Sequence, residues 1–124
     1  MKIIVLDDHK EFREQVVEIL TRNGHEARAV EKAEEAIPLA ESGEYDFVLV
    51  DFSMPEHDGI WFMKNAKRPK RTKAILTTAY VNRQVIDTMF RAGVRGYLIK
   101  PFTEADLIRH LEFHSGVVRQ SAAQ

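Results

Sequence analysis

Residues 47–59 read Phe-Val-Leu-Val-Asp-Phe-Ser-Met-Pro-Glu-His-Asp-Gly, an apolar run that leads into a carboxylate and then into a turn. The run 47–50 has no polar alternation, which is typical of a strand covered on both faces in the centre of a parallel sheet. Asp51 then stands at the carboxyl end of that strand, where open α/β sheets bind ligands. It is therefore a candidate site residue, although on its own it equally fits the start of a turn or a helix cap.

The composition is that of an ordinary globular chain of one domain, with 124 residues, 44% hydrophobic and 30% charged. A net charge of −1 gives no reason to expect bulk electrostatic binding to nucleic acid or to an anionic membrane. The absence of cysteine excludes disulfides, thiolate metal sites and thiol nucleophiles. No apolar run approaches the roughly 18 residues that span a bilayer, and the chain enters a strand directly. We therefore expect a cytoplasmic protein without direct contact to nucleic acid or membrane.

Strand and helix patterns alternate along the rest of the chain. Strands are predicted at 3–6, 25–30, 74–77 and 96–99, and helices between about 12 and 23, 31 and 42, 60 and 66, 82 and 93, and 103 and 114. Asn82 is expected to cap the fourth helix, and Thr103 with Asp106 resembles a capping box at the fifth. Because Pro38 lies inside the second helical pattern, we expect this helix to start late, near Glu34.

Two segments are expected to lie outside the regular elements and to be exposed to solvent. The basic residues between 67 and 73 have no aromatic residues among them, so we interpret this segment as a solvated loop and not as a phosphate contact. Residues 116–124 resemble a tail or the start of a linker, which leaves residues 1–115 as the domain.

Five alternations of strand and helix predict a doubly wound parallel sheet with right-handed crossovers and five helices on its two faces. The flavodoxin-like strand order 2-1-3-4-5 is a common solution at this size, and its switch point lies between strands one and three. Asp7 and Asp8 follow the first strand and Asp51 ends the third. We therefore expect three carboxylates to meet in one crevice.

Such a cluster needs a compensating charge. Two carboxylates about 5 Å apart repel by roughly 3 kcal/mol at an effective dielectric near 20. Oxygen ligands favour a hard cation, and a site with few protein ligands suits Mg²⁺. Lys100 and Thr78 stand at the ends of the two neighbouring strands. A carboxylate, a metal, an ammonium and a hydroxyl around one point are the groups that phosphoryl transfer requires.

At these positions the sequence resembles the receiver domain of bacterial two-component response regulators, the CheY-like family, over residues 2 to about 114. The matching features are Asp7-Asp8, Asp51 with Met54-Pro55 and Asp58-Gly59, Thr78-Ala79, Ala92-Gly93, and Tyr97 ahead of Lys100-Pro101-Phe102. Each feature is weak alone, but all of them in order at the expected strand ends are highly specific.

The resemblance implies a role for each site residue. Asp51 would accept a phosphoryl group from the phosphohistidine of a histidine kinase or a phosphotransfer protein. Asp8, Asp51 and the backbone carbonyl of Ser53 would hold Mg²⁺, with Asp7 acting largely through metal-bound water. Lys100 would contact the phosphoryl oxygens. The resemblance also implies a cis bond between Lys100 and Pro101, which the residues themselves do not predict.

The resemblance further implies a signalling module and not an enzyme, apart from self-catalysed phosphoryl transfer and dephosphorylation. Thr78 would move to the phosphoryl group, and Tyr97 would then turn inward. This would repack the surface of the fourth helix, fifth strand and fifth helix, where a downstream target or a second copy would read the state. Arg91, Arg95 and Glu104 are expected on that surface.

Two side chains are expected to control access to the phosphoryl group. Ser53, two residues after Asp51, is small and should leave the path of the attacking water open. Tyr80, two residues after Thr78, is bulky and should narrow it. We therefore expect a phosphorylated state of intermediate lifetime.

Three side chains near the site are not assigned to it. His9 and His57 are interpreted as solvent-exposed loop residues, because oxygen ligands already complete a hard-ion site. Trp61 lies opposite the apolar face of its short helix, so we expect it to be partly exposed, toward a partner or over its own helix.

The alternative function is an aspartyl-phosphate phosphatase of the haloacid dehalogenase type, which also uses an Asp nucleophile and Mg²⁺. That pattern requires a second Asp two residues after the nucleophile of the first strand, but here His9 and Lys10 follow Asp7 and Asp8 at that distance. The chain also lacks room for a cap domain. An FMN-binding flavodoxin is weaker still, since no Ser/Thr/Gly-rich phosphate loop follows the first strand.

Overall fold

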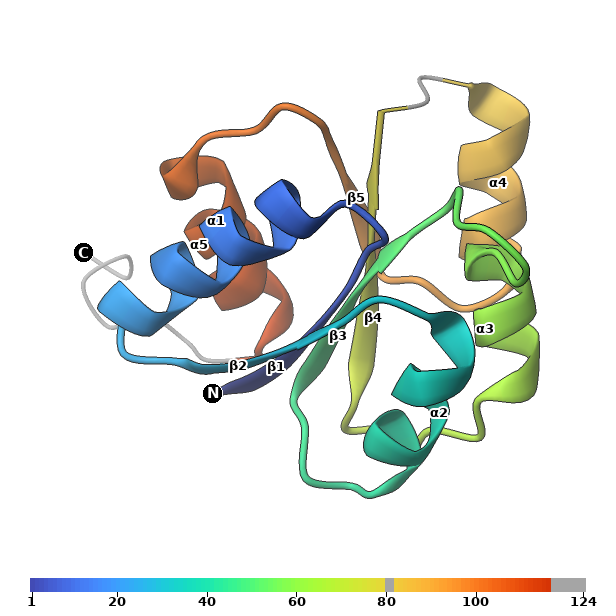
Figure 1. The fold of residues 1–124 in the computed structure, drawn as a ribbon, viewed down its shortest axis with the longest axis horizontal. Coiled ribbons are helices and arrows are strands. Elements are labelled where there is room, and N and C mark those ends of the chain that lie inside the picture. The colour runs from blue at the N-terminus through green and yellow to red at the C-terminus, as the bar shows by residue number, and fades with distance from the viewer. Residues whose placement is uncertain (80–81, 117–124) are drawn as a thin grey trace.

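Five strands and five helices alternate in the computed structural model, which describes residues 1–79 and 82–116 (Figure 1). The strands are β1 Lys2–Leu6, β2 Glu26–Val30, β3 Phe47–Asp51, β4 Lys73–Thr78 and β5 Gly96–Ile99. The helices are α1 Lys10–Arg22, α2 Ala33–Glu41, α3 Gly59–Asn65, α4 Arg83–Arg91 and α5 Glu104–His114. Each element lies within a few residues of its predicted position.

The strands form one parallel sheet in the order β2-β1-β3-β4-β5, which confirms the flavodoxin-like prediction. Leu6 of β1 pairs with Val50 of β3, and Asp51 pairs with Thr77 of β4. Thr78 pairs with Ile99 of β5. The carboxyl ends of four strands therefore meet along one edge.

Helices cover both faces of the sheet, with α1 and α5 on one side and α2, α3 and α4 on the other (Figure 1). Alternate residues of one strand enter the two cores: Val48 and Val50 pack toward α2 and α3, while Phe47 and Leu49 pack toward α1 and α5. This double burial explains why the strand sequence is continuously apolar. Each such side chain contributes roughly 1.5–3 kcal/mol on burial.

The second helix starts at Ala33, one residue before the predicted Glu34, yet Pro38 still lies inside it. The late start that we expected therefore does not remove the proline from the helix. Pro38 and Glu34 are both exposed, so the Glu34 carbonyl that would accept the missing N–H can bind water instead.

Lys67, Lys70 and Arg71 of the basic segment 67–73 are exposed, as a solvated loop predicts, but Arg68 is partly buried and two of the arginines make structural contacts. Arg68 donates to the carbonyl of Gly93 at 3.2 Å, and Arg71 donates to the Asp46 carboxylate at 2.6 Å. These guanidinium groups tie the loop to the amino-terminal edge of the sheet and to the α4–β5 turn. They hold the structure together and leave no cluster of unpaired arginines for a phosphate.

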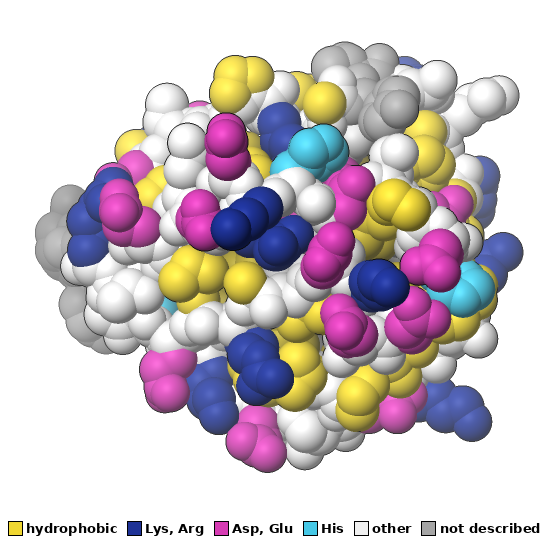
Figure 2. Space-filling model, viewed as in Figure 1, with side chains coloured by type: hydrophobic (Ala, Val, Ile, Leu, Met, Phe, Trp, Pro, Cys, Tyr) yellow, Lys and Arg dark blue, Asp and Glu magenta, His cyan; other side chains and the backbone are white. Residues whose placement is uncertain are grey.

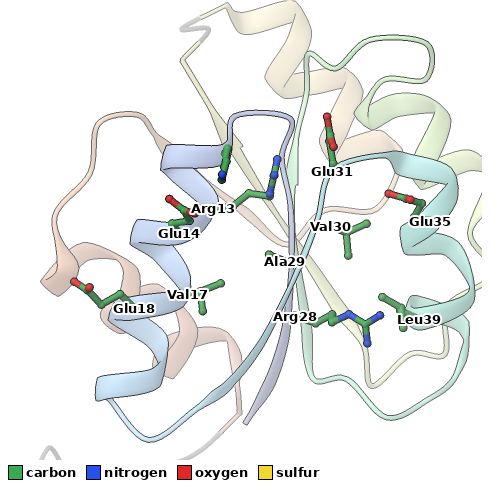
Figure 3. Close-up of a pocket in the computed structure, with 11 residues that line it drawn as sticks. Arg13, Glu14, Val17, Glu18, Arg28, Ala29, Val30, Glu31, Glu35 and Leu39 are labelled. Atoms are coloured by element: carbon green, nitrogen blue, oxygen red, sulfur yellow. The ribbon is translucent and has the colours of Figure 1, made fainter.

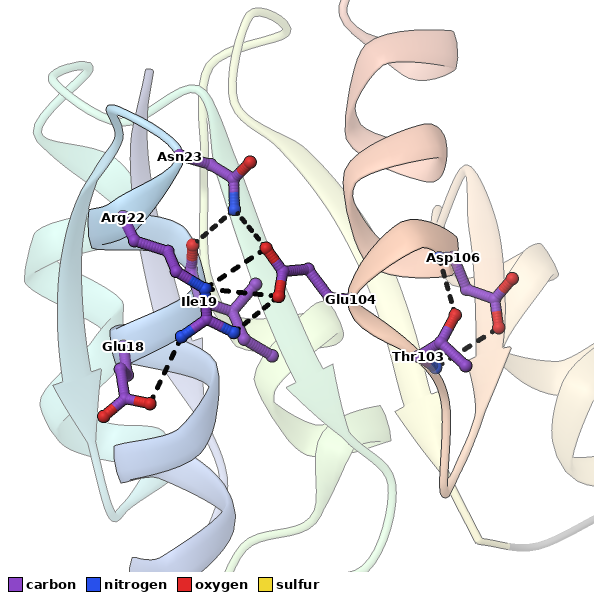
Figure 4. A network of polar contacts seen from close by, with 7 residues as sticks. All are labelled: Glu18, Ile19, Arg22, Asn23, Thr103, Glu104 and Asp106. Atoms are coloured by element: carbon purple, nitrogen blue, oxygen red, sulfur yellow. Dashed lines mark hydrogen bonds and ion pairs between the residues drawn. The ribbon is translucent and has the colours of Figure 1, made fainter.

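The start of α5 is fixed by two sets of contacts, shown in Figure 4. Thr103 and Asp106 form the predicted capping box, in which each side chain accepts from the other residue's backbone N–H. Glu104 accepts from Arg22 and Asn23 at the end of α1, and these bonds lower the pKa of the Glu104 carboxyl. Glu104 therefore faces α1, and its part in the signalling surface that we expected stays a prediction.

Charged side chains of both signs are intermixed over the face shown in Figure 2, in agreement with the net charge of −1. Among the described helices none is both long and apolar enough to cross a membrane. The α5 helix ends at His114, and residues 117–124 of the predicted tail lie outside the described residues. The domain boundary at 115 stays a prediction.

Candidate functional site

Four side chains converge where β1 and β3 end. Asp7, Asp8, His9 and Asp51 each offer an oxygen or nitrogen atom, and these atoms all lie within 4.8 Å of one another. The pairing of β1 with β3 brings them together, because their carboxyl ends lie side by side. The prediction that three carboxylates meet in one crevice is confirmed, and His9 joins them.

Asp7 is the innermost of the carboxylates, with no exposed surface. Its Oδ2 accepts from Lys100 Nζ at 2.5 Å, and its Oδ1 accepts from the backbone N–H of His9 at 2.9 Å. Its side chain does not cap α1, whose N-cap residue is His9. Asp7 therefore holds the ammonium of Lys100 at the bottom of the crevice.

Lys100 reaches the crevice from the end of β5. Its Nζ lies 3.6 Å from Asp51 Oδ1 and 4.1 Å from the centre of the Phe12 ring. The charge is thus shared between two carboxylates and the face of an aromatic ring. The bond between Lys100 and Pro101 is cis, as the family resemblance implied.

Asp8 is the more open neighbour, with 23% of its side chain exposed. Its Oδ1 is buried and has no hydrogen-bond partner among the described residues, although His9 Nδ1 lies 3.3 Å away at ion-pair distance. A buried carboxylate oxygen without a donor is costly and normally has a partner. The oxygen donors and this unpaired atom fit a hard divalent cation.

Asp51 is 4% exposed, and burial raises its pKa to about 6. The charges of Asp7 and Asp8 act in the same direction, while Lys100 and His9 oppose them. At neutral pH the carboxylate is mostly ionised but is less stable than in water. A cation at this position would offset the negative charge of the cluster and favour the ionised Asp51.

The loop after Asp51 is fixed by the predicted Asp58-Gly59 pair. The Asp58 side chain accepts from the backbone N–H of Trp61 at 2.9 Å and caps α3. A Cβ on Gly59 would lie 2.6 Å from the Asp51 carbonyl oxygen, so no other residue fits without a shift. Ser53 is exposed and lines a hollow of about 1030 Å³ together with Asp8, Asp51 and Lys100.

The residues assigned to switching lie on β4 and β5. Thr78 is fully buried, and its carbonyl accepts from the Lys100 backbone N–H at 2.8 Å. Tyr97 points outward, 38% exposed, and its ring packs edge-on against Phe90 with the centroids 6.1 Å apart. Tyr80, assigned to access control, lies outside the described residues.

Sequence reasoning missed the contacts of the two histidines near the site. The His57 ring stacks on Trp61 with 3.7 Å between centroids, so the half-buried Trp61 is covered on one side by its own loop. The exposed ring of His9 reaches both Asp7 and Asp8 with its Nδ1. The signal for His9 was its position directly after the paired aspartates.

A second hollow lies at the outer edge of the sheet, along β2 between α1 and α2 (Figure 3). Arg13 and Arg28 line it together with Glu14, Glu31 and Glu35. Charges of both signs surround it, so it favours neither anions nor cations. None of the residues that we assigned to the site lines this hollow.

The chain is similar in sequence and in fold to proteins of known family. The chain is 34% identical over 116 residues to chemotaxis protein CheY-3 of Vibrio cholerae, which covers 90% of this chain and 89% of that protein. It is 32% identical to chemotaxis protein CheY of Pseudomonas aeruginosa, which covers 90% and 94%. A solved structure of Vibrio cholerae CheY4 has a TM-score of 0.83 at 24% identity, covering 90% of this chain and 96% of that one, and supports the fold alone.

The family model described as the response regulator receiver domain matches residues 3–112. The phosphatase alternative is not favoured by any of these matches. Since the match spans almost the whole described domain, and relatives that share about a third of its residues are aligned over most of their length, this chain belongs to the receiver domains of two-component response regulators.

Proposed function

We propose that this domain is a switch that accepts a phosphoryl group on Asp51 from the phosphohistidine of a histidine kinase or a phosphotransfer protein. Receiver domains as a family interact with histidine kinases and downstream effectors, and they generally bind Mg²⁺ at an acidic pocket. The observation that carries the proposal is the buried Asp51, lying between the ammonium of Lys100 and the unpaired Oδ1 of Asp8.

Asp8, Asp51 and the Ser53 carbonyl would hold Mg²⁺ directly, and Asp7 would act through a metal-bound water. When bound, Mg²⁺ supplies positive charge close to the phosphoryl oxygens. The unpaired Asp8 Oδ1 supports this assignment, because it is the one described site oxygen that is buried without a donor.

The chain's own groups have complementary tasks. An Asp51 carboxylate oxygen forms a bond to phosphorus while the phosphorus–nitrogen bond of the donor histidine breaks, and the electron pair returns to the imidazole. Lys100, already 3.6 Å from Asp51, would move part of its charge from Asp7 to the phosphoryl oxygens. Hydrolysis would reverse the modification, and the roles assigned to Ser53 and Tyr80 in controlling the access of water stay predictions.

The signal would leave through α4, β5 and α5. Phe90, Tyr97 and Ile99 are exposed large apolar residues on or beside β5, and such groups mark interaction surfaces more often than isolated ones do. Arg91 and Arg95 are exposed at the same end of α4 and support a polar rim. A partner or second copy would bind here when Tyr97 changes its orientation.

The experiment that tests the function is incubation with acetyl phosphate, followed by intact-mass spectrometry. We expect one added phosphoryl group in the presence of Mg²⁺ and none after chelation with EDTA, because the buried charges at Asp51 would repel the donor. Equal modification with and without Mg²⁺, or none under either condition, would overturn the proposal.

Replacing Thr78 by Ala should uncouple the surface from the site. The variant is expected to accept the phosphoryl analogue beryllofluoride, but its amide chemical shifts should change only near Asp51. In the unmodified sequence the changes should extend across α4 and β5, since a hydroxyl donor to the new oxygens biases the two states. Thr77→Ala is the matched control, because Thr77 is the buried neighbour on the opposite face of β4. If the changes spread equally far in Thr78→Ala, the hydroxyl is not the coupling group.

A further inference from the structure

The imidazole of His9 is the only nitrogen ring among the four groups that converge at this site in the described residues. Its side chain is 70% exposed, yet Nδ1 points inward and lies 3.2 Å from Asp7 Oδ1 and 3.3 Å from Asp8 Oδ1. An exposed ring held in this way is placed by the turn after β1, where the Asp7 carboxylate accepts from the His9 backbone N–H.

The separation of His9 Nδ1 from Asp8 Oδ1 matches that of neighbouring ligands on one ion. In a six-coordinate site with bonds of about 2.2 Å, adjacent donors lie about 3.1 Å apart and opposite donors about 4.4 Å apart. The distance of 3.3 Å from His9 Nδ1 to Asp8 Oδ1 agrees with adjacent positions, and the 4.8 Å limit that contains all four groups leaves room for opposite ones. A cation that takes the unpaired Asp8 Oδ1 therefore has His9 Nδ1 within reach.

The identity of the donor matters for the choice of ion. Mg²⁺ prefers oxygen ligands and water, whereas first-row transition ions gain from an imidazole nitrogen. We propose that His9 supplies a nitrogen ligand to the cation at Asp8 and Asp51, so that this site binds transition cations such as Mn²⁺ more tightly relative to Mg²⁺ than the carboxylates alone would. The inference rests on the proposed cation site and adds a selectivity to it.

A simpler role for the same contact is a hydrogen bond from a protonated Nδ1 to Asp7. In that case the ring never binds the metal, and removing it changes the affinity for every divalent cation by a similar factor. The two roles therefore differ in the ratio of affinities for Mn²⁺ and Mg²⁺, and in whether nitrogen lies next to the bound ion.

Mn²⁺ is the best probe, because its preference for carboxylates directs it to this cluster and not to other imidazoles. His25, for example, lies 3.0 Å from the terminal amine and would compete for softer ions. His9→Ala is expected to fold, since His9 makes no side-chain capping bond to α1. His57→Ala is the matched control, because that ring also lies in a loop at this edge of the sheet but stacks on Trp61.

Pulsed electron paramagnetic resonance of bound Mn²⁺ should show coupling to an imidazole ¹⁴N in the unmodified protein and in His57→Ala, and none in His9→Ala. Calorimetric titration should show roughly tenfold weaker Mn²⁺ binding in His9→Ala, with Mg²⁺ binding changed by less than about twofold. Binding of Mn²⁺ without nitrogen coupling, or an unchanged ratio of the two affinities, would overturn the role of His9 alone. Failure of Mn²⁺ to bind would overturn the cation site of the proposed function as well.

Discussion

Replacing Asp51 by Asn is expected to abolish phosphorylation and, at the same time, to stabilise the metal-free protein. Modification should fall to the background level, because the amide is not a nucleophile and no other described carboxylate lies beside Lys100 except Asp7, which is fully buried. Stability should rise because burial raises the pKa of Asp51 to about 6, so ionised Asp51 destabilises the folded state.

The direction of this change in stability with pH follows from proton binding by Asp51. Between the ordinary Asp value of 3.8 and about 6, the folded state holds a proton that the unfolded state has lost, so stability falls as the pH rises through this window. Above it the penalty is complete, about 3 kcal/mol at pH 7.5, and about half of it is present at pH 5.

Urea unfolding at the two pH values measures this difference. Asp51→Asn should be more stable than the unmodified protein at both pH values, and the difference in unfolding free energy should be larger at pH 7.5 than at pH 5. Added Mg²⁺ should reduce the difference at pH 7.5. Asp87→Asn, on the exposed side of α4, is the control and should have the same free energy of unfolding as the unmodified protein at both pH values. An Asp51→Asn variant that equals the unmodified protein at pH 7.5 would show that the buried carboxylate carries no such penalty.

The sheet was predictable because the burial of its central strands on both faces is visible in the sequence as unbroken apolar runs. The runs 3–6 and 47–50 are buried on both faces, so every residue in them is apolar, and the carboxylates that follow mark where they end. The predicted strand ends were less exact: β4 begins at Lys73, a partly buried residue that pairs with Phe47. Short strands tolerate one charged residue at the edge, which periodicity does not reveal.

The positions of the site residues were predictable for the same reason, but their contacts were not. The topology alone brings Asp7, Asp51 and Lys100 to one edge. The direction of Glu104 toward Arg22 depends on how α1 and α5 pack against each other, 82 residues apart in sequence. The inward turn of His9 depends on the backbone after β1, and a propensity argument contains neither of these facts.

Replacing Lys100 by Met is expected to give the largest loss of stability at this site. The ammonium lies 2.5 Å from Asp7 Oδ2 and 3.6 Å from Asp51 Oδ1, and both carboxylates are buried. Removing one partner of a buried pair commonly costs about 3–5 kcal/mol, because the remaining charge is left without compensation. Met retains an apolar stem and a sulfur that can pack on the Phe12 ring, so the loss is chiefly electrostatic.

A second charge or a proton should therefore rescue this variant. Below pH 6 Asp51 takes up a proton, and with Mg²⁺ the cation replaces part of the missing charge, so the loss relative to the unmodified protein should shrink by more than half under either condition. Lys10→Met is the matched control: Lys10 is exposed at the start of α1 and should cost almost nothing at any pH. Thermal and urea unfolding at pH 5.5 and 8, with and without Mg²⁺, measure both variants. If Lys100→Met lost equal stability at both pH values and gained nothing from Mg²⁺, its role would lie in packing against Phe12, and Lys100 could not be the group that compensates the buried carboxylates.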